Sequence, residues 1–245
     1  MPKMIQIDGT QHRFAFTRTG PTDATEAFRA ALAATGVNAD APATVLCDGD
    51  AGLWRLQHEV LPGATPVLDW WHAAVRFEHA LQAARSLGKG TAEAPLAERA
   101  VRSLERAKWR LWHGRWPGCR RRLAALCRWM QRRPMRDAAG VDKVRQHIAY
   151  LLDYLERNEA ALVHYAARRR RGEPIATSFV ESAVDEIIAW RMAKAQQMRW
   201  SKLTVSPFLD VRTAVLNDTL EDAFRHRHHG FRPANDDHRI NAVAA

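Results

Sequence analysis

Apolar residues recur along the N-terminal part of the chain in patterns that predict alternating strands and helices. Strand-like runs at residues 4–7 and 12–17 flank Asp8-Gly9, a dipeptide that favours a tight hairpin turn because both positions tolerate a positive φ. Residues 22–35 carry apolar side chains at helical spacing and are followed by a glycine, which is typical of a helix end. The pattern therefore predicts a hairpin followed by an amphipathic helix.

The next stretch predicts two buried strands that enclose a short helix. Residues 43–47 form a brief apolar run that ends in an Asp-Gly-Asp turn, and residues 65–68 form a second one. A short helix is expected at residues 53–60 between them. A longer helix should begin after Asp69 and run to about residue 87.

Helical periodicity dominates the remainder of the chain. It continues to about residue 171 with breaks at glycines and prolines, which predicts a helical insertion and no further sheet. Two later helices are expected at about 178–198 and 210–225. The tail from His226 carries no packing pattern, so we expect it to be disordered.

Positive charge is concentrated in one part of this helical region. The formal net charge is +10, and residues 99–136 hold thirteen arginines or lysines against the single acid Glu105. Four of the nine tryptophans lie there, and basic residues mixed with aromatic ones suit phosphate contact combined with base stacking. An alternative remains open: Trp109, Trp112 and Trp116 follow i, i+3, i+7 spacing, which is typical of one buried helix face with solvated arginines.

Length and composition exclude several classes of protein. At 245 residues with 47% hydrophobic residues, the chain can bury a core, and no run reaches the roughly eighteen apolar residues of a membrane span. The three cysteines are odd in number and form no CxxC pair, which argues against a disulfide framework or a zinc motif. We therefore expect a cytoplasmic protein with no membrane partner.

Two acids stand where a metal-dependent enzyme would place them. Asp48 follows a predicted buried strand, and ligands of α/β folds bind at the carboxyl ends of strands. Glu181 lies at the start of a predicted amphipathic helix. Each has a structural alternative, because Asp48 could only turn the chain, while Ser178 and Glu181 match a helix-capping box.

Asp69 and His72 form a third candidate pair. Their i, i+3 spacing places a carboxylate and an imidazole on one helical face, where they could share a ligand or hydrogen-bond to each other. A histidine held only for structural reasons is the alternative.

Ordered motifs along the chain resemble the DDE transposases of bacterial insertion sequences, in a branch related to Mutator-like enzymes and associated with Kra-type elements. The resemblance covers about residues 14–233, and its C-terminal block is the most specific part. The motifs are LCDG at 46–49, LDWWH at 68–72 with RF at 76–77, KWRLWHG at 108–114, GEPIATSFVES at 172–182, KAQQMRWS at 194–201 and RTAVLN at 212–217.

The resemblance implies an α-rich α/β protein with a ribonuclease H-like core and a large helical insertion. Asp48 and Glu181 would be the second and third catalytic acids and would bind Mg²⁺ or Mn²⁺ for phosphodiester cleavage and strand transfer, with Asp69 and His72 as an accessory motif. The implied segments are 1–75 (partial core), 76–171 (helical insertion), 172–225 (C-terminal core helices) and 226–245 (disordered tail).

DNA is the partner that the resemblance implies, both as transposon ends and as target, and self-association into a homo-oligomer is left open. The basic side chains expected at the DNA are Lys108, Arg110, Arg115, Arg120, Arg121, Arg191, Lys194 and Arg199.

The chain also departs from the family pattern. The family's first aspartate belongs to a first strand, whereas this chain starts within the hairpin, and Asp8 is interpreted as a turn residue. Residues 202–208 replace a stretch with glycine and histidine. We therefore expect an N-terminally truncated transposase, inactive alone, with a non-catalytic DNA-binding remnant and a helical interaction protein as alternatives.

Overall fold

The computed structural model describes residues 2–7, 10–15, 23–37, 40, 42–87, 94–132, 139–177 and 201–230. The chain divides into two compact units. Met1–Asn38 and Phe179–Ala245 form the first unit, and Ala39–Ser178 form the second. The segment 1–75, expected from the sequence to be one partial core, therefore contributes to both units.

The first unit contains the expected hairpin. Strands β1 (Pro2–Ile7) and β2 (Thr10–Ala15) pair antiparallel, with Ile7 opposite Thr10 across the turn. Helix α1 (Ala24–Ala34) follows, and the chain leaves it through Gly36 at a φ of +74°, a left-handed conformation that glycine adopts without strain. The hairpin and this helix are thus confirmed close to their expected boundaries.

The C-terminal part of this unit differs from the single helix expected at 210–225. Helix α10 (Lys202–Leu216) begins earlier, because the Ser201 hydroxyl caps its N-terminus by accepting from the Thr204 amide at 3.2 Å. It ends where Asp218 adopts a φ of +56°, and a separate helix α11 (Leu220–Arg227) follows. Residues 226 and 227, expected to start a disordered tail, belong to that helix.

The edge of β2 is paired with the end of α10. The Asn217 side chain accepts from the Arg13 amide at 2.8 Å and donates to the Arg13 carbonyl at 2.6 Å. A side-chain amide thus supplies the hydrogen bonds that a neighbouring strand would otherwise provide. The two contacts hold the hairpin to the helix within this unit.

The second unit begins with a β-α-β arrangement. Strand β3 (Thr44–Cys47), helix α2 (Ala51–Val60) and strand β4 (Thr65–Leu68) follow in order, and the two strands pair in parallel with Cys47 beside Leu68. The parallel pair requires the intervening helix as its crossover connection. Both strands and the helix are confirmed.

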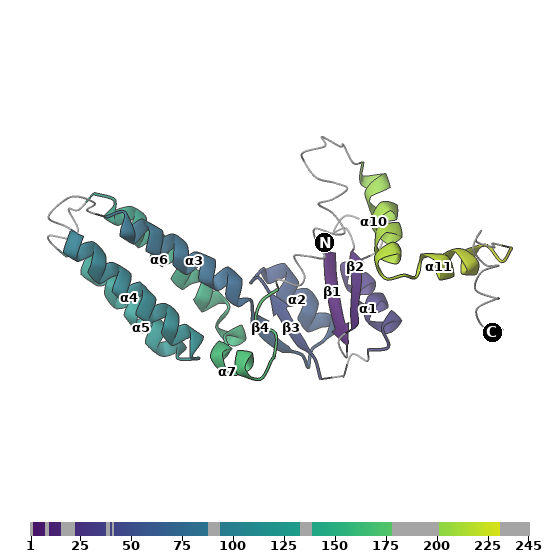
Figure 1. Ribbon diagram of the computed structural model, residues 1–245, viewed down its shortest axis with the longest axis horizontal. Helices are drawn as coiled ribbons and strands as arrows, with labels where there is room; N and C mark the ends of the chain where they lie inside the picture. The colour runs from purple at the N-terminus through teal and green to yellow at the C-terminus, as the bar shows by residue number, and fades with distance from the viewer. Residues whose placement is uncertain are drawn as a thin grey trace, which may run out of the picture. The chain divides into compact units, whose positions relative to one another are not determined.

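Four long helices pack beside this arrangement as a bundle (Figure 1). They are α3 (Trp70–Arg85), α4 (Ala94–Trp112), α5 (Trp116–Met130) and α6 (Val141–Arg157). The short helix η2 (Glu159–Ala161) and helix α7 (Tyr165–Arg170) close the unit. The expectation that this region is helical is confirmed.

Apolar spacing explains why these helices form a bundle. The buried positions of α4 are separated by three or four residues, as a helix with one apolar stripe requires. Each helix contributes at least one fully buried large side chain to the shared core: Phe77, Leu104, Leu123 and Leu151.

The α-rich α/β class is therefore confirmed. The strands that the structure describes form two separate two-stranded sheets, β1 with β2 and β3 with β4. A ribonuclease H-like core would join such strands in a single sheet. The ribonuclease H-like fold therefore remains a prediction.

Candidate functional site

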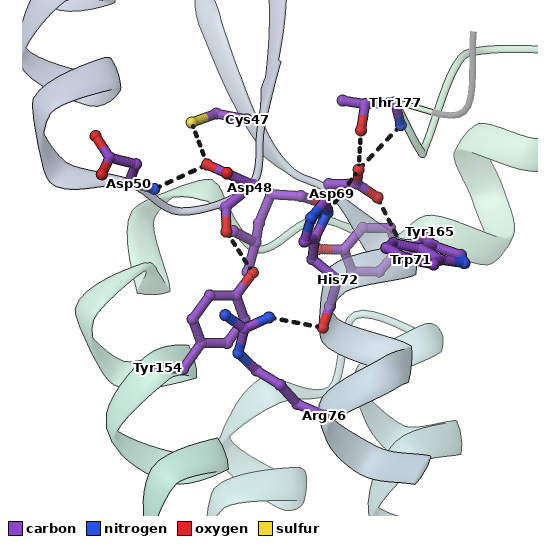
Figure 2. A network of polar contacts seen from close by, with 11 residues as sticks. Cys47, Asp48, Asp50, Asp69, Trp71, His72, Arg76, Tyr154, Tyr165 and Thr177 are labelled. Carbon is purple, nitrogen blue, oxygen red and sulfur yellow. Dashed lines mark hydrogen bonds and ion pairs between the residues drawn. The ribbon is translucent and has the colours of Figure 1, made fainter. Parts of the chain in front are cut away.

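The carboxyl ends of β3 and β4 bring Asp48 and Asp69 together. Each aspartate directly follows its strand, and the Asp69 amide donates to the Cys47 carbonyl at 2.9 Å. Adjacent parallel strands end at the same edge of a sheet, so both carboxylates belong to one site (Figure 2). This placement matches the position where α/β folds bind ligands.

The Asp48-Gly49-Asp50 turn is a tightly built structural element. Asp50 caps α2 by accepting from the Leu53 amide at 2.9 Å, and Asp48 Oδ1 accepts from the Asp50 amide at 3.1 Å. Gly49 has a φ of +94° and lies so close to α6 that an added Cβ would sit 2.8 Å from Tyr154 Cε2. The turn and cap expected as the structural alternative are therefore present.

Asp48 nevertheless keeps an oxygen for another role. Its Oδ1 atom takes the Asp50 amide and lies 3.5 Å from Cys47 Sγ, while Oδ2 has no partner among the residues that the structure describes. The side chain is partly exposed to solvent. A ligand or cation could therefore reach one carboxylate oxygen without disrupting the turn.

Residues of helix α6 and its C-terminal end are hydrogen-bonded to this turn and to α2. The Tyr154 hydroxyl donates to the Asp48 carbonyl at 2.8 Å, and Asn158 links the Trp54 indole at 2.7 Å to the Tyr154 carbonyl at 2.8 Å. Burial raises the pKa of the Tyr154 hydroxyl above its ordinary value, against an opposing effect of the Arg76 guanidinium. The hydroxyl therefore stays protonated and acts as a donor at neutral pH.

Asp69 is fully buried and uses both of its carboxylate oxygens (Figure 2). Oδ1 accepts from the Trp71 amide at 2.7 Å, and Oδ2 accepts from the Thr177 amide at 3.0 Å and also from the Thr177 hydroxyl. His72 Nδ1 lies 3.0 Å from the same Oδ2. A buried carboxylate is tolerated only when it is satisfied in this way, so Asp69 acts as a structural junction.

This junction fastens two distant parts of the chain. Thr177 lies 108 positions after Asp69, and the Trp70 amide donates to the Ile175 carbonyl at 2.9 Å. The segment that leads toward Glu181 is thereby attached to the edge of the sheet. The hydrogen bond that the sequence allowed between Asp69 and His72 is thus present, and the role of the pair as an accessory to catalysis stays a prediction.

His72 and Arg76 occupy the next turn of α3. A carboxylate can only accept, so His72 Nδ1 carries the proton of this contact, and its ring is 27% exposed. The Arg76 guanidinium lies 3.7 Å from the centroid of the Tyr154 ring and donates to the His72 carbonyl at 3.0 Å. Arg76 thus places a fixed positive charge at this site, a role that its place in the Arg76-Phe77 motif did not indicate.

A second candidate site lies between α4 and α5, where a groove of about 620 Å³ is lined mainly by arginines. We call it the arginine groove. Trp129 and Ser103 also line it, and the lining contains no carboxylate. Its arginines are Arg99, Arg102, Arg106, Arg110, Arg121 and Arg122.

The arginine groove contains only some of the residues expected at DNA. Arg110 and Arg121 line it, whereas Lys108 and Arg115 do not. Arg120 points elsewhere and forms an ion pair with Glu156 at 2.7 Å. Of the remaining expected sites, Glu181, Arg191, Lys194 and Arg199 lie outside the described residues, as does Asp8.

Sequence reasoning missed Arg99, Arg102, Arg106 and Arg122. A signal was present, because the α4 arginines of the groove are separated by three or four residues, as side chains on one helical face must be. The decisive information was which face of α5 lies opposite, and that depends on packing. Sequence position alone could not distinguish Arg121 from Arg120.

The tryptophans of this region do not form one helical stripe. Helix α4 ends at Trp112 and α5 begins at Trp116, so a turn between two helices separates them. Trp109 is 58% exposed, while Trp112 packs against Trp70 with ring centroids 4.8 Å apart and Trp116 is buried. The alternative of a single buried face over these three residues is therefore wrong.

The described residues do not on their own make a metal centre. Among them, no group of three or more histidine, cysteine, aspartate or glutamate side chains converges as a metal site would require. Asp48 offers one oxygen, and Asp69 has none to spare. None of the helices described here is long and apolar enough to span a membrane.

Comparison with known proteins does not extend this description. No protein-family model, no curated protein and no solved structure matches the chain.

Proposed function

We propose that this chain binds nucleic acid through the arginine groove, as the DNA-binding part of a DDE-type insertion-sequence transposase. The observation that supports the proposal is a groove whose lining holds six arginines and no carboxylate. Clustered like charges repel one another, and a polyanion relieves that repulsion while releasing its own counterions.

The pairing of the arginines supports the same reading. Within the described part of the chain, Arg106, Arg110, Arg121 and Arg122 have no ion-pair partner, while Arg102 pairs with Glu98 at 3.2 Å. Most of the positive charge of the groove is therefore available to a ligand.

The spacing along α4 suits an extended ligand. Arg99 and Arg110 are eleven residues apart on one helix, which corresponds to about 16 Å at a rise of about 1.5 Å per residue. One strand of a duplex presents a phosphate about every 3.4 Å along its axis, so several phosphates fall within this length. A single small anion would leave most of these arginines unused.

Salt dependence gives the test of this proposal. If four unpaired arginines each neutralise a phosphate, log Kobs should fall against log salt with a slope of about −3.6 for duplex DNA. Replacing Arg106, Arg110 and Arg121 together by glutamine removes three of these charges and should bring the slope to about −1. Fluorescence anisotropy with a labelled duplex between 50 and 200 mM salt measures both values.

Two neighbouring residues provide the matched control. Arg121→Gln and Arg120→Gln remove the same charge one position apart, but only Arg121 lines the groove. Arg121→Gln should reduce the slope by about 0.9, and Arg120→Gln should leave it nearly unchanged. Equal effects of the two variants, or no binding at low salt, would contradict the proposal.

We further propose Asp48 and Glu181 as the second and third acids of a phosphodiester-cleaving site. The free Oδ2 of Asp48 at the end of β3 favours this assignment. Glu181 lies outside the described residues, so its assignment rests on the resemblance of the sequence. Mg²⁺ or Mn²⁺ would need more carboxylates than Asp48 alone, so the described residues do not complete such a site.

Cleavage is tested separately from binding. Because Asp8 is interpreted as a turn residue, the chain supplies two of three acids and should not nick DNA with Mg²⁺ or Mn²⁺. The assay compares wild type with Asp8→Ala and Glu181→Ala on a supercoiled plasmid. Turnover that both substitutions abolish would instead identify Asp8 as the first acid, while no turnover beside intact binding supports a non-catalytic DNA-binding remnant.

A further inference from the structure

The arginine groove contains a flat, layered surface in addition to its charges. The Arg99 guanidinium of α4 stacks over the Trp129 ring of α5, with its central carbon 4.6 Å from the ring centroid. Arg99 is exposed, and Trp129 is partly buried against the core beneath it. The indole therefore supports an exposed guanidinium in the lining of the groove.

A guanidinium plane is a surface on which a nucleic-acid base can stack. Proteins that bind single strands combine a basic groove with planar side chains, and these include arginine guanidinium groups in addition to aromatic rings. The neighbouring arginines of the groove would then contact the phosphates on either side of the stacked base. This layout differs from an evenly charged surface, which would read only phosphates.

Stacking on Arg99 also favours one strand over two. In a duplex the bases are stacked on each other and their faces are out of reach of Arg99, although the phosphates can still contact the arginines. An unpaired strand can place both its phosphates and a base within the groove.

We infer that the arginine groove selects single-stranded nucleic acid, with a base stacked on the Arg99–Trp129 pair and phosphates on the remaining arginines. This inference rests on the proposed nucleic-acid binding and adds the form of nucleic acid that the groove takes. DNA and RNA share the chemistry that the groove recognises.

Oligonucleotides of equal length test the inference without altering the protein. The probes are a dT12 strand, an rU12 strand, a 12-base-pair duplex and a 12-unit abasic strand that keeps the phosphates but lacks bases. Single strands should bind at least about five-fold more tightly than the duplex, because only they can place a base on Arg99. The abasic strand should bind at least about five-fold more weakly than dT12, since one stacked base contributes that much or more.

Arg99→Lys is the sharpest variant, because it keeps the charge and removes the plane. It should weaken dT12 binding about five-fold or more while leaving the abasic strand and the duplex unchanged. Arg120→Lys is the matched control outside the groove, where Arg120 pairs with Glu156, and it should change none of these affinities. Circular dichroism confirms that each variant keeps its helices.

The outcomes separate this inference from the function on which it rests. A single-strand preference with either sugar, lost in the abasic strand and in Arg99→Lys, supports it, and the ratio of dT12 to rU12 affinity identifies the sugar. Duplex affinity equal to or above that of dT12, or equal binding of the abasic strand, overturns the inference and leaves nucleic-acid binding intact. Failure of every probe to bind at low salt overturns both.

Discussion

Replacing Gly49 by alanine should destabilise the second unit by an amount that the structure allows to be worked out. The φ of +94° is strained for any residue with a Cβ, which costs about 1–2 kcal/mol. The new Cβ would also lie 2.8 Å from Tyr154 Cε2, so the ring must move and its hydrogen bond to the Asp48 carbonyl is lost, at about 1 kcal/mol more. The expected loss is about 2–3 kcal/mol.

Two other glycines of the same unit separate these contributions. Gly172 has a φ of +73° with nothing within 4 Å of an added Cβ, so Gly172→Ala should show the backbone strain alone, about 1–2 kcal/mol. Gly63 has open space and no left-handed φ, so Gly63→Ala should stay within about 0.5 kcal/mol of wild type. The series therefore ranks strain with clash, strain alone, and neither.

Urea denaturation followed by circular dichroism at 222 nm measures this series. Thermal midpoints should follow the same order, with Gly49→Ala lower than wild type by roughly 5–10 °C. The reasoning would be refuted if Gly49→Ala were no more destabilising than Gly172→Ala, because α6 would then not press on the turn. The position of Asp48 would in that case not depend on Tyr154.

Two further predictions concern the junction and a histidine. Asp69→Asn should lower the free energy of unfolding by about 2–4 kcal/mol, since the new amide nitrogen would face the two donors of Thr177. Thr177→Val should lower it by about 1–2 kcal/mol. Urea denaturation measures both values, and equal losses would show that the Thr177 amide contributes nothing. Burial, then the charges of His79 and Lys143, lower the pKa of His147, so its neutral form is favoured in the folded state. The neutral form of His147 therefore stabilises the fold above the ordinary histidine pKa, and this contribution is lost as pH falls below it. Between pH 7 and pH 5 the urea midpoint of His147→Gln should fall less than that of wild type. An unchanged loss in His147→Gln would assign the acid sensitivity to other groups.

Local sequence determined most of the secondary structure of this protein. The hairpin, α1, both parallel strands and the helical region follow from apolar period and from turn residues, because these depend on neighbours a few positions away. The same local logic failed at α10, where the Ser201 cap and the left-handed Asp218 moved the helix boundaries. A helix cap or a positive φ at a non-glycine residue gives a weaker signal in the sequence than a periodic apolar pattern does.

Tertiary structure alone decided what the candidate residues do. Asp69 and His72 were identified by their spacing, but only the arrival of Thr177 from 108 positions away shows that the carboxylate is fully used. In the same way, α5 brings Arg121 to the groove and turns Arg120 toward Glu156. The sequence of a helix does not specify which element packs beside a given surface charge. Packing across long sequence separations therefore determines which arginines face a common ligand.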